Sequence, residues 1–141
     1  MTIYLDTSAA VPLFVPEPAS SAVVAWLESC TDTLISSDWI LTEFASALAI
    51  KVRRGELAQK HAKAAWEEFE IFSRSGLRLV PVTREAFNHA ARLVRNIRGS
   101  LRAGDSLHLA MAIETDVASL ATADSQLEES AIAQGMTVNR F

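Results

Sequence analysis

The chain of 141 residues suffices for one domain that buries a core without disulfides or a structural metal. Half of the residues are hydrophobic, which excludes disorder, and a single cysteine, Cys30, excludes an internal disulfide and a cysteine-based zinc site. The net charge of −4 argues against a general nucleic-acid coat protein. With no charged leader and no apolar run near the roughly 18 residues of a membrane span, we expect a cytoplasmic protein that makes no membrane contact.

Charge is distributed unevenly along the chain. Residues 1–50 contain six acids and no Lys or Arg, residues 51–102 contain twelve Lys or Arg and five Glu, and residues 103–141 contain six acids and one Arg. This pattern predicts a basic surface beside an acidic site. The alternative is that the basic residues only keep helix faces solvated.

The first candidate strand, from Thr2 to Leu5, ends on Asp6, which Thr7 and Ser8 follow. In a parallel sheet, ligands bind beyond the carboxyl ends of the strands, where Asp6 would be held by a rigid element. The alternative is that Asp6 only caps the helix that begins near Ser8.

Further strands and helices alternate along the rest of the chain. The hydrophobic pattern predicts helices over residues 8–15, 19–30, 38–54, 57–73, 83–97, 106–115 and 125–133, and strands over 33–37, 77–82, 117–122 and 137–139. Ser37 is a candidate N-cap for the helix 38–54, and Gly55 is its candidate stop. The alternation predicts one α/β domain, residues 1–141, with a parallel sheet covered on both faces.

The predicted helix 38–54 is apolar on nearly every side, so it lies in the centre of the domain or meets another subunit. Glu43 is the only charged residue between Trp39 and Ile50. An isolated acid in such a helix needs a partner, either a metal ion or a purely structural ion pair.

Four carboxylates have similar settings. Asp6 and Asp124 each follow a short strand and precede a helix, which places both on one rim of the sheet, while Asp105 opens an apolar helix and Glu43 lies within one. Clustered carboxylates repel one another, and a divalent cation relieves this repulsion. Because no cysteine or multi-histidine pattern is present, the oxygen ligands favour Mg²⁺ or Mn²⁺. The set predicts phosphodiester hydrolysis without a covalent enzyme intermediate.

Each of these residues has a structural alternative. Asp124 acts only as an N-cap, or Asp105 only as a favourable charge at a helix N-terminus. Ser8 and Thr122 bind the acids or a metal-bound water, or else they bind local backbone. His108 follows Asp105 by one turn, and it either orients that acid or is a core-edge histidine with a local hydrogen bond.

Four arginines lie near the end of the basic middle third of the chain. Arg92, Arg95 and Arg98 are three residues apart, so they are expected to line one stripe of the helix predicted over 83–97. Together with Arg102 they would form a basic surface beside the acids. Alternatively, they pair with acidic faces of neighbouring helices.

Four short runs resemble the acidic motifs of PIN-domain ribonucleases, and the similarity extends over essentially the whole chain. The runs are Tyr4 to Ala9, Leu41 to Leu48, Ala103 to Ala110 and Leu120 to Asp124. Their order, spacing and compact length resemble the VapC toxins of type II toxin-antitoxin systems. Gly104 before the third acid and Ala123 before the fourth are small departures from the family pattern.

The resemblance implies a PIN-like three-layer α/β/α fold with a parallel sheet of about five strands. It also implies Mg²⁺- or Mn²⁺-dependent endoribonuclease activity, a homodimer, and inhibition by a VapB-type antitoxin. The catalytic, metal-binding acids would be Asp6, Glu43, Asp105 and Asp124, and Ser8 would be the hydroxyl of the first motif. With RNA as the substrate, the basic group of Arg92, Arg95, Arg98 and Arg102 would hold its backbone beside the acids.

Two other functions compete with this reading. One is a catalytically silent module that binds RNA or protein at the same site. The other is an aspartyl-phosphate phosphatase with Asp6 as the nucleophile. That chemistry usually needs a second acid two residues later, where this chain has Ser8.

Overall fold

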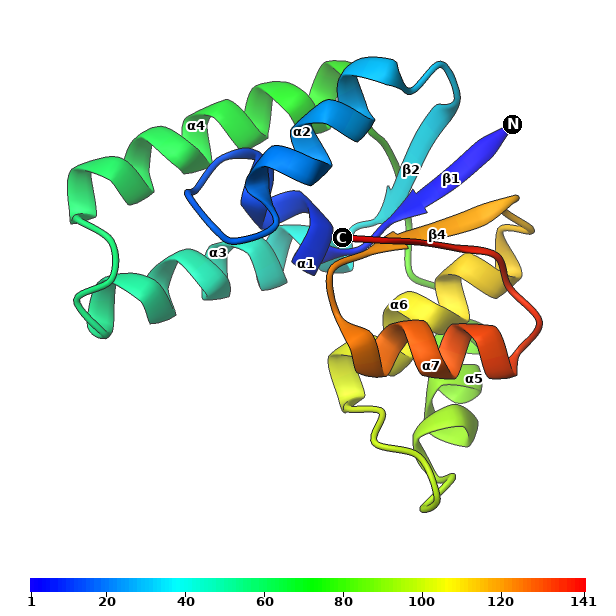
Figure 1. Ribbon diagram of the computed structural model, residues 1–141. Helices are drawn as coiled ribbons and strands as arrows, with labels where there is room; N and C mark the ends of the chain where they lie inside the picture. Colours follow the sequence, from blue (N-terminus) through cyan, green and yellow to red (C-terminus); the bar gives the residue numbers. More distant parts are fainter.

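A parallel sheet of five strands forms the centre of the structure, a computed structural model that describes residues 1–141 (Figure 1). The strands are β1 (Thr2–Leu5), β2 (Thr33–Ser37), β3 (Arg78–Val80), β4 (Ser119–Thr122) and β5 (Val138–Arg140). They lie in the order β3-β2-β1-β4-β5, and all four neighbouring pairs are parallel. From β1 the chain adds β2 and then β3 on one side, and it later adds β4 and then β5 on the other side of β1. The carboxyl ends of β1 and β4 therefore flank the point at which open parallel sheets bind ligands.

Helices cover both faces of the sheet, as the alternation predicted. They are α1 (Thr7–Ala10), the 3₁₀ helix η1 (Val11–Leu13), α2 (Ser20–Ser29), α3 (Trp39–Arg53), α4 (Gln59–Ser75), α5 (Arg84–Val94), α6 (Ala103–Glu114) and α7 (Ser125–Ala133). The first four α-helices and η1 cover one face, and α5 to α7 cover the other (Figure 1). This is the expected three-layer α/β/α architecture. No helix combines the length and the apolar character needed to span a lipid bilayer.

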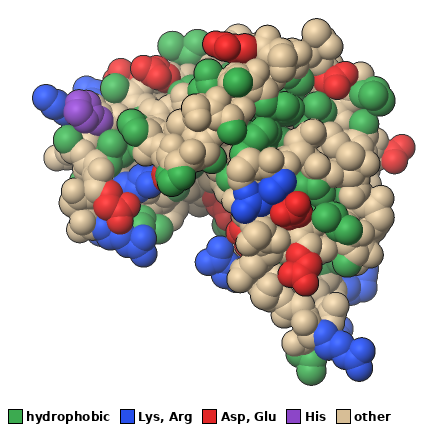
Figure 2. Space-filling model, in the orientation of Figure 1, with side chains coloured by type: hydrophobic (Ala, Val, Ile, Leu, Met, Phe, Trp, Pro, Cys, Tyr) green, Lys and Arg blue, Asp and Glu red, His purple; other side chains and the backbone are tan.

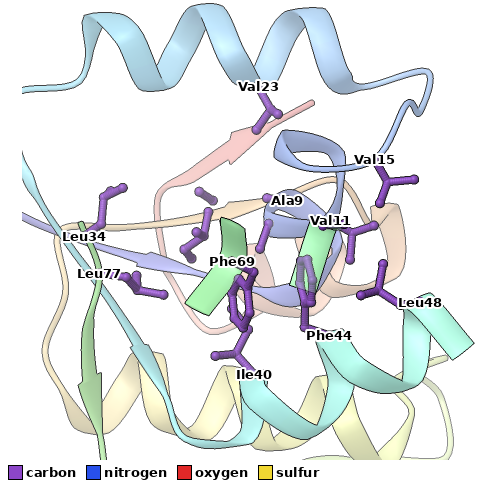
Figure 3. Packing of buried hydrophobic residues seen from close by; sticks show 14 of the residues in the cluster. Ala9, Val11, Val15, Val23, Leu34, Ile40, Phe44, Leu48, Phe69 and Leu77 are labelled. Carbon is purple, nitrogen blue, oxygen red and sulfur yellow. The ribbon is translucent and has the colours of Figure 1, made fainter. Parts of the chain in front are cut away.

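Alternate residues of the central strand enter different cores. Ile3 and Leu5 face the layer that contains α3 and α4, whereas Tyr4 faces α5 to α7. In the first core, Phe44 of α3 stacks on Phe69 of α4 with 3.9 Å between the ring centroids and 7° between the planes. Figure 3 shows these two rings side by side among the buried aliphatic side chains. The pairing fixes α4 against α3.

The two apolar helices are buried to different extents. In α3, Phe44 and Leu48 are fully or almost fully buried, whereas Thr42 and Ala45 on the opposite side are exposed. In α6, every residue from Ser106 to Ala112 is buried. The second core therefore encloses α6 on all sides, which explains its nearly uniform apolar sequence.

Several predicted boundaries differ from the structure. The helix predicted over 8–15 is divided into α1 and η1, in which Pro12 occupies the first turn. The helix predicted from Ser106 begins earlier, at Ala103, so Asp105 lies in its first turn. Ser37 does not cap α3, because its hydroxyl accepts a hydrogen bond from Tyr4 at 3.0 Å.

The predicted arginine stripe on α5 does not form. This helix ends at Val94, so Arg95 is its C-cap and Arg98 lies in the following loop. The side chain of Asn96 accepts a hydrogen bond from the backbone N–H of Arg98 at 3.2 Å. This local turn competes with further helical hydrogen bonds and explains the early end.

Candidate active site

A cleft of about 880 Å³ lies at the carboxyl ends of β1 and β4, where α1 and α7 begin. All four predicted acids line it: Asp6, Glu43, Asp105 and Asp124. Figure 2 shows acidic side chains in the recess of this face, with Lys or Arg side chains on its rim. Four segments far apart in the sequence therefore bring their carboxylates to one cleft. Their position after strands predicted this for Asp6 and Asp124, and the resemblance implied it for Glu43 and Asp105.

Asp6 follows β1 directly and is only 2% exposed. It is the N-cap of α1, and its Oδ1 accepts a hydrogen bond from the backbone N–H of Ala9 at 3.2 Å. Ser8 Oγ donates to the same carboxylate, 2.9 Å from Oδ1 and 3.0 Å from Oδ2. Burial raises the pKa of Asp6 to about 6, against the opposing effects of His108, Ser8 and the Ala9 amide. Asp6 thus both caps α1 and lines the cleft.

Asp124 has the same double role after β4. Its Oδ1 accepts hydrogen bonds from the backbone N–H groups of Gln126 at 2.8 Å and Leu127 at 3.3 Å, so it caps α7. Its Oδ2 lies 3.6 Å from Nη2 of Arg102. One oxygen therefore fixes the helix and leaves the other for a cation.

The two predicted hydroxyls join the strand ends. Ser8 Oγ lies 3.1 Å from Thr122 Oγ1 and accepts a hydrogen bond from the backbone N–H of Ala123 at 2.9 Å. Thr122 Oγ1 accepts from the backbone N–H of Asp124 at 3.0 Å. Ser8 thus binds an acid directly, whereas Thr122 positions Asp124 through its backbone.

Asp105 has the least satisfied carboxylate of the four. Only two buried side-chain polar atoms in the structure lack a hydrogen-bond partner, Oδ2 of Asp105 and Nε1 of Trp39. Burial, reinforced by the charge of Asp124, raises the pKa of Asp105, although Arg102 opposes the shift. A buried carboxylate oxygen that has no hydrogen-bond partner and lies in the field of Asp124 and Glu43 is suited to bind a cation.

Glu43 reaches the cleft from α3. Its Oε2 accepts hydrogen bonds from Nε2 of His108 and from the hydroxyl of Thr7, both at 2.6 Å. Burial alone would raise the pKa of Glu43, but the hydrogen bond and charge of His108, together with Thr7, outweigh it and lower this pKa. A Cβ on Gly104 would collide with Oε1 of Glu43. The glycine that departs from the family pattern therefore admits this carboxylate beside α6.

His108 is fully buried, and both predictions for it are wrong. Its partners are distant in sequence and do not include Asp105: Nδ1 lies 2.9 Å from the Tyr4 hydroxyl, and Nε2 binds Glu43. Burial lowers the pKa of His108, but Tyr4, Glu43 and Asp6 outweigh it and raise this pKa to about 10. The imidazolium therefore holds Glu43 in place. No local sequence signal pairs α6 with α3, so sequence reasoning missed this contact and those of Tyr4 and Thr7.

Of the four predicted RNA-binding arginines, only Arg102 lines the cleft. Its guanidinium bridges Asp105 and Asp124, with Nε 3.5 Å from one carboxylate and Nη2 3.6 Å from the other. Arg92, Arg95 and Arg98 are exposed, and none of them lies within 4 Å of a carboxylate. Their predicted alternative, pairing with acidic faces of neighbouring helices, therefore does not occur.

The donor set matches a hard divalent cation in chemistry. No group of three or more His, Cys, Asp or Glu side chains is arranged to enclose a metal ion directly. Mg²⁺, however, typically keeps several waters and takes only one or two protein carboxylates. The unpartnered Oδ2 of Asp105 and the cleft-facing Oδ2 of Asp124 supply such a pair.

Comparison with known proteins identifies the family. The family model of the PIN domain matches residues 3–132. Ribonuclease VapC45 of Mycobacterium tuberculosis (strain CDC 1551 / Oshkosh) is 33% identical over 141 residues, which cover 96% of this chain and 93% of the relative.

Solved structures share the fold. The crystal structure of Mycobacterium tuberculosis VapC20, a toxin that cleaves the sarcin-ricin loop, superposes with a TM-score of 0.73 at 19% identity and covers 91% of this chain and 94% of its own. VapBC2 from Rickettsia felis, solved bound to a promoter DNA fragment, gives a TM-score of 0.70 at 15% identity over 99% of this chain and 98% of its own. From the matched residues and the full-length identity to VapC45, this chain belongs to the PIN domain family and is a VapC-type member of it.

Proposed function

We propose that this protein is a Mg²⁺- or Mn²⁺-dependent endoribonuclease that hydrolyses RNA phosphodiester bonds. The observation that carries the proposal is the convergence of Asp6, Glu43, Asp105 and Asp124 on one cleft. Burial raises the pKa of both Asp6 and Asp105, so two of the acids are held in a setting that penalises uncompensated negative charge. Carboxylates with perturbed pKa values are typical of functional sites. The membership in the VapC-type proteins supports RNA as the substrate class.

The four acids would hold the metal, some of them directly and the others through its waters, and the metal when bound would polarise a water for attack and stabilise the leaving oxygen. The chain's own part is positioning. Ser8 and the Ala9 amide fix Asp6, the N-terminus of α7 fixes Asp124, and His108 fixes Glu43. Pre-set carboxylates require little rearrangement when the substrate arrives.

The proposed RNA path runs across the basic middle third of the chain. Arg102 stands in the cleft, and Arg92, Arg95 and Arg98 lie free of ion pairs on the end of α5 and in the loop toward α6. Guanidinium groups without protein partners remain available to phosphate oxygens. Substituting the last three by Gln is expected to weaken RNA binding and to reduce its salt dependence, without changing the cleavage position.

We further propose that the protein is the toxin of a VapBC-type pair in the cytoplasm and forms a homodimer. A VapB-type antitoxin would be its inhibitor. A small open reading frame for a DNA-binding protein immediately upstream of the gene would support this assignment. For the dimer, Phe87, Val94 and Ile97 expose apolar side chains on α5 and the loop after it. Light scattering on the wild type and Phe87→Glu tests this surface, since a dimer through it becomes a monomer in the variant.

The decisive experiment compares cleavage of RNA by the wild type, Asp105→Asn and Asp38→Asn. Asp38 is an exposed acid outside the cleft, so its variant controls for the loss of one charge. Cleavage is expected in Mg²⁺ or Mn²⁺ and not in EDTA, and only Asp105→Asn should be inactive while it remains folded by circular dichroism. Sequencing the RNA ends then gives the cleavage site. Full activity of Asp105→Asn, or cleavage in EDTA, contradicts the proposal.

The geometry supports two alternative functions to different degrees. The first is a binding module without catalysis, since Asp6 and Asp124 are helix N-caps and this structural role alone accounts for their positions. Binding of RNA without cleavage in either metal would select it. A phosphatase with Asp6 as the nucleophile fits less well, because Ser8 Oγ donates to both oxygens of this carboxylate.

A further inference from the structure

Arg102 has a backbone that is anchored to α6 and a side chain that is largely exposed. Its carbonyl accepts the hydrogen bond of the Ser106 N–H at 2.9 Å, which anchors the residue to the first turn of α6. Its side chain, in contrast, is 74% exposed. The guanidinium can therefore leave the cleft without any change in the helix.

The guanidinium lies against two carboxylate oxygens that no hydrogen bond satisfies. Its Nε is 3.5 Å from Oδ2 of Asp105 and its Nη2 is 3.6 Å from Oδ2 of Asp124. Oδ2 of Asp105 is buried without a hydrogen-bond partner, and the cap of α7 uses only Oδ1 of Asp124. One positive group thus bridges the two oxygens that are best placed to share a divalent ion.

The other cations of the cleft are held elsewhere. Lys51 pairs with Glu17, and Arg140 lies 3.2 Å from Glu128. Neither of these partners belongs to the four acids. Arg102 is consequently the only Lys or Arg of the protein within 4 Å of a proposed metal ligand.

We propose that Arg102 is an internal counter-ion of Asp105 and Asp124 that a divalent cation must displace, so that it sets the metal concentration at which the site fills. The inference rests on the proposed nuclease function. Without metal, the guanidinium reduces the repulsion between the two acids. Its contacts are long and its guanidinium is exposed, which makes them weak and easily exchanged for a dication. The displaced side chain then points a free guanidinium at the mouth of the cleft, where RNA enters.

The test measures binding of Mn²⁺ alone, by electron paramagnetic resonance of the free ion, to the full-length wild type, Arg102→Gln, Arg102→Lys and Arg84→Gln. Arg84 is an exposed arginine at the start of α5 without a carboxylate within 4 Å, so it controls for net charge. Removal of the competing guanidinium should tighten Mn²⁺ binding by Arg102→Gln about two- to fivefold. Arg102→Lys, which keeps the charge, should stay near the wild type, as should Arg84→Gln.

Thermal unfolding provides a second measurement, in which the size of the Mn²⁺-induced shift separates a counter-ion from a purely structural residue. In EDTA, Arg102→Gln should melt below the wild type because the acids lose their counter-ion, whereas Mn²⁺ should raise its melting temperature more than that of the wild type. Equal or weaker Mn²⁺ binding by Arg102→Gln, or no Mn²⁺ binding by either protein, overturns the inference. Cleavage of RNA by the wild type in EDTA would instead contradict the nuclease proposal, and the comparison of Mn²⁺ affinities does not depend on that result.

Discussion

Asp6 should destabilise the metal-free protein at neutral pH. Burial raises its pKa from the ordinary 3.8 to about 6. Because the folded-state pKa is the higher one, the folded chain binds more protons between these values, so stability is full below about pH 4 and falls as pH rises through 6. At about 1.4 kcal/mol for each pKa unit, the charged carboxylate costs up to about 3 kcal/mol above pH 6.

Asp6→Asn removes this charge and keeps a carbonyl oxygen that accepts from Ser8 and Ala9. In EDTA the variant should exceed the wild type by up to about 3 kcal/mol at pH 7.5 and match it near pH 4. Urea unfolding across this pH range measures the difference, with the exposed Asp38→Asn as the control. Saturating Mn²⁺ should stabilise the wild type more than the variant. A difference between the two proteins that does not change with pH would refute the role of burial.

Three further substitutions examine the supports of the site and of the core. Gly104→Ala should lower both the melting temperature and RNA cleavage because its Cβ collides with Glu43, although Ala normally favours a helix by about 1 kcal/mol; an unchanged variant would contradict this close approach. His108→Gln should lose about 1–3 kcal/mol in urea unfolding and most of its cleavage activity, and a variant as stable as the wild type would show that the buried pair with Glu43 contributes nothing. Phe44→Ala removes one ring of the stack with Phe69 and should cost about 3–5 kcal/mol while the folded fraction stays active, so inactivity of the folded protein would place Phe44 in the site.

The sheet and its two helical layers could be predicted because their signals are local. Most strands contain a short apolar run, and the order of strands and helices restricts the topology to parallel crossovers. Element ends were less predictable, because they depend on individual side-chain hydrogen bonds. Asn96, for example, ends α5 by binding the backbone of Arg98, and this removed the arginine stripe that regular spacing predicted.

The acids of the site were predictable, whereas their supports were not. Asp6 and Asp124 follow strands whose carboxyl ends must share a rim, so their convergence follows from topology. The bond between His108 and Glu43 joins residues of α6 and α3, and nothing in either helix specifies the other. Gly104 similarly looks like an irrelevant departure until the neighbouring carboxylate is placed beside it. Contacts between side chains of different helices can be identified only in the packed structure.

The four carboxylates differ in how firmly the fold holds them and in how well their negative charge is compensated. Asp6 and Asp124 are fixed by helix N-termini, and Glu43 is fixed by an imidazolium, so folding sets their positions before any ion arrives. Asp105 has no hydrogen bond to its buried oxygen, and its nearest positive charge is the exposed Arg102. Because a cation contributes most where a charge is least compensated, Asp105 should dominate metal affinity. The site therefore leaves the buried oxygen of Asp105 unsatisfied, while the positions of the other three acids are fixed by hydrogen bonds.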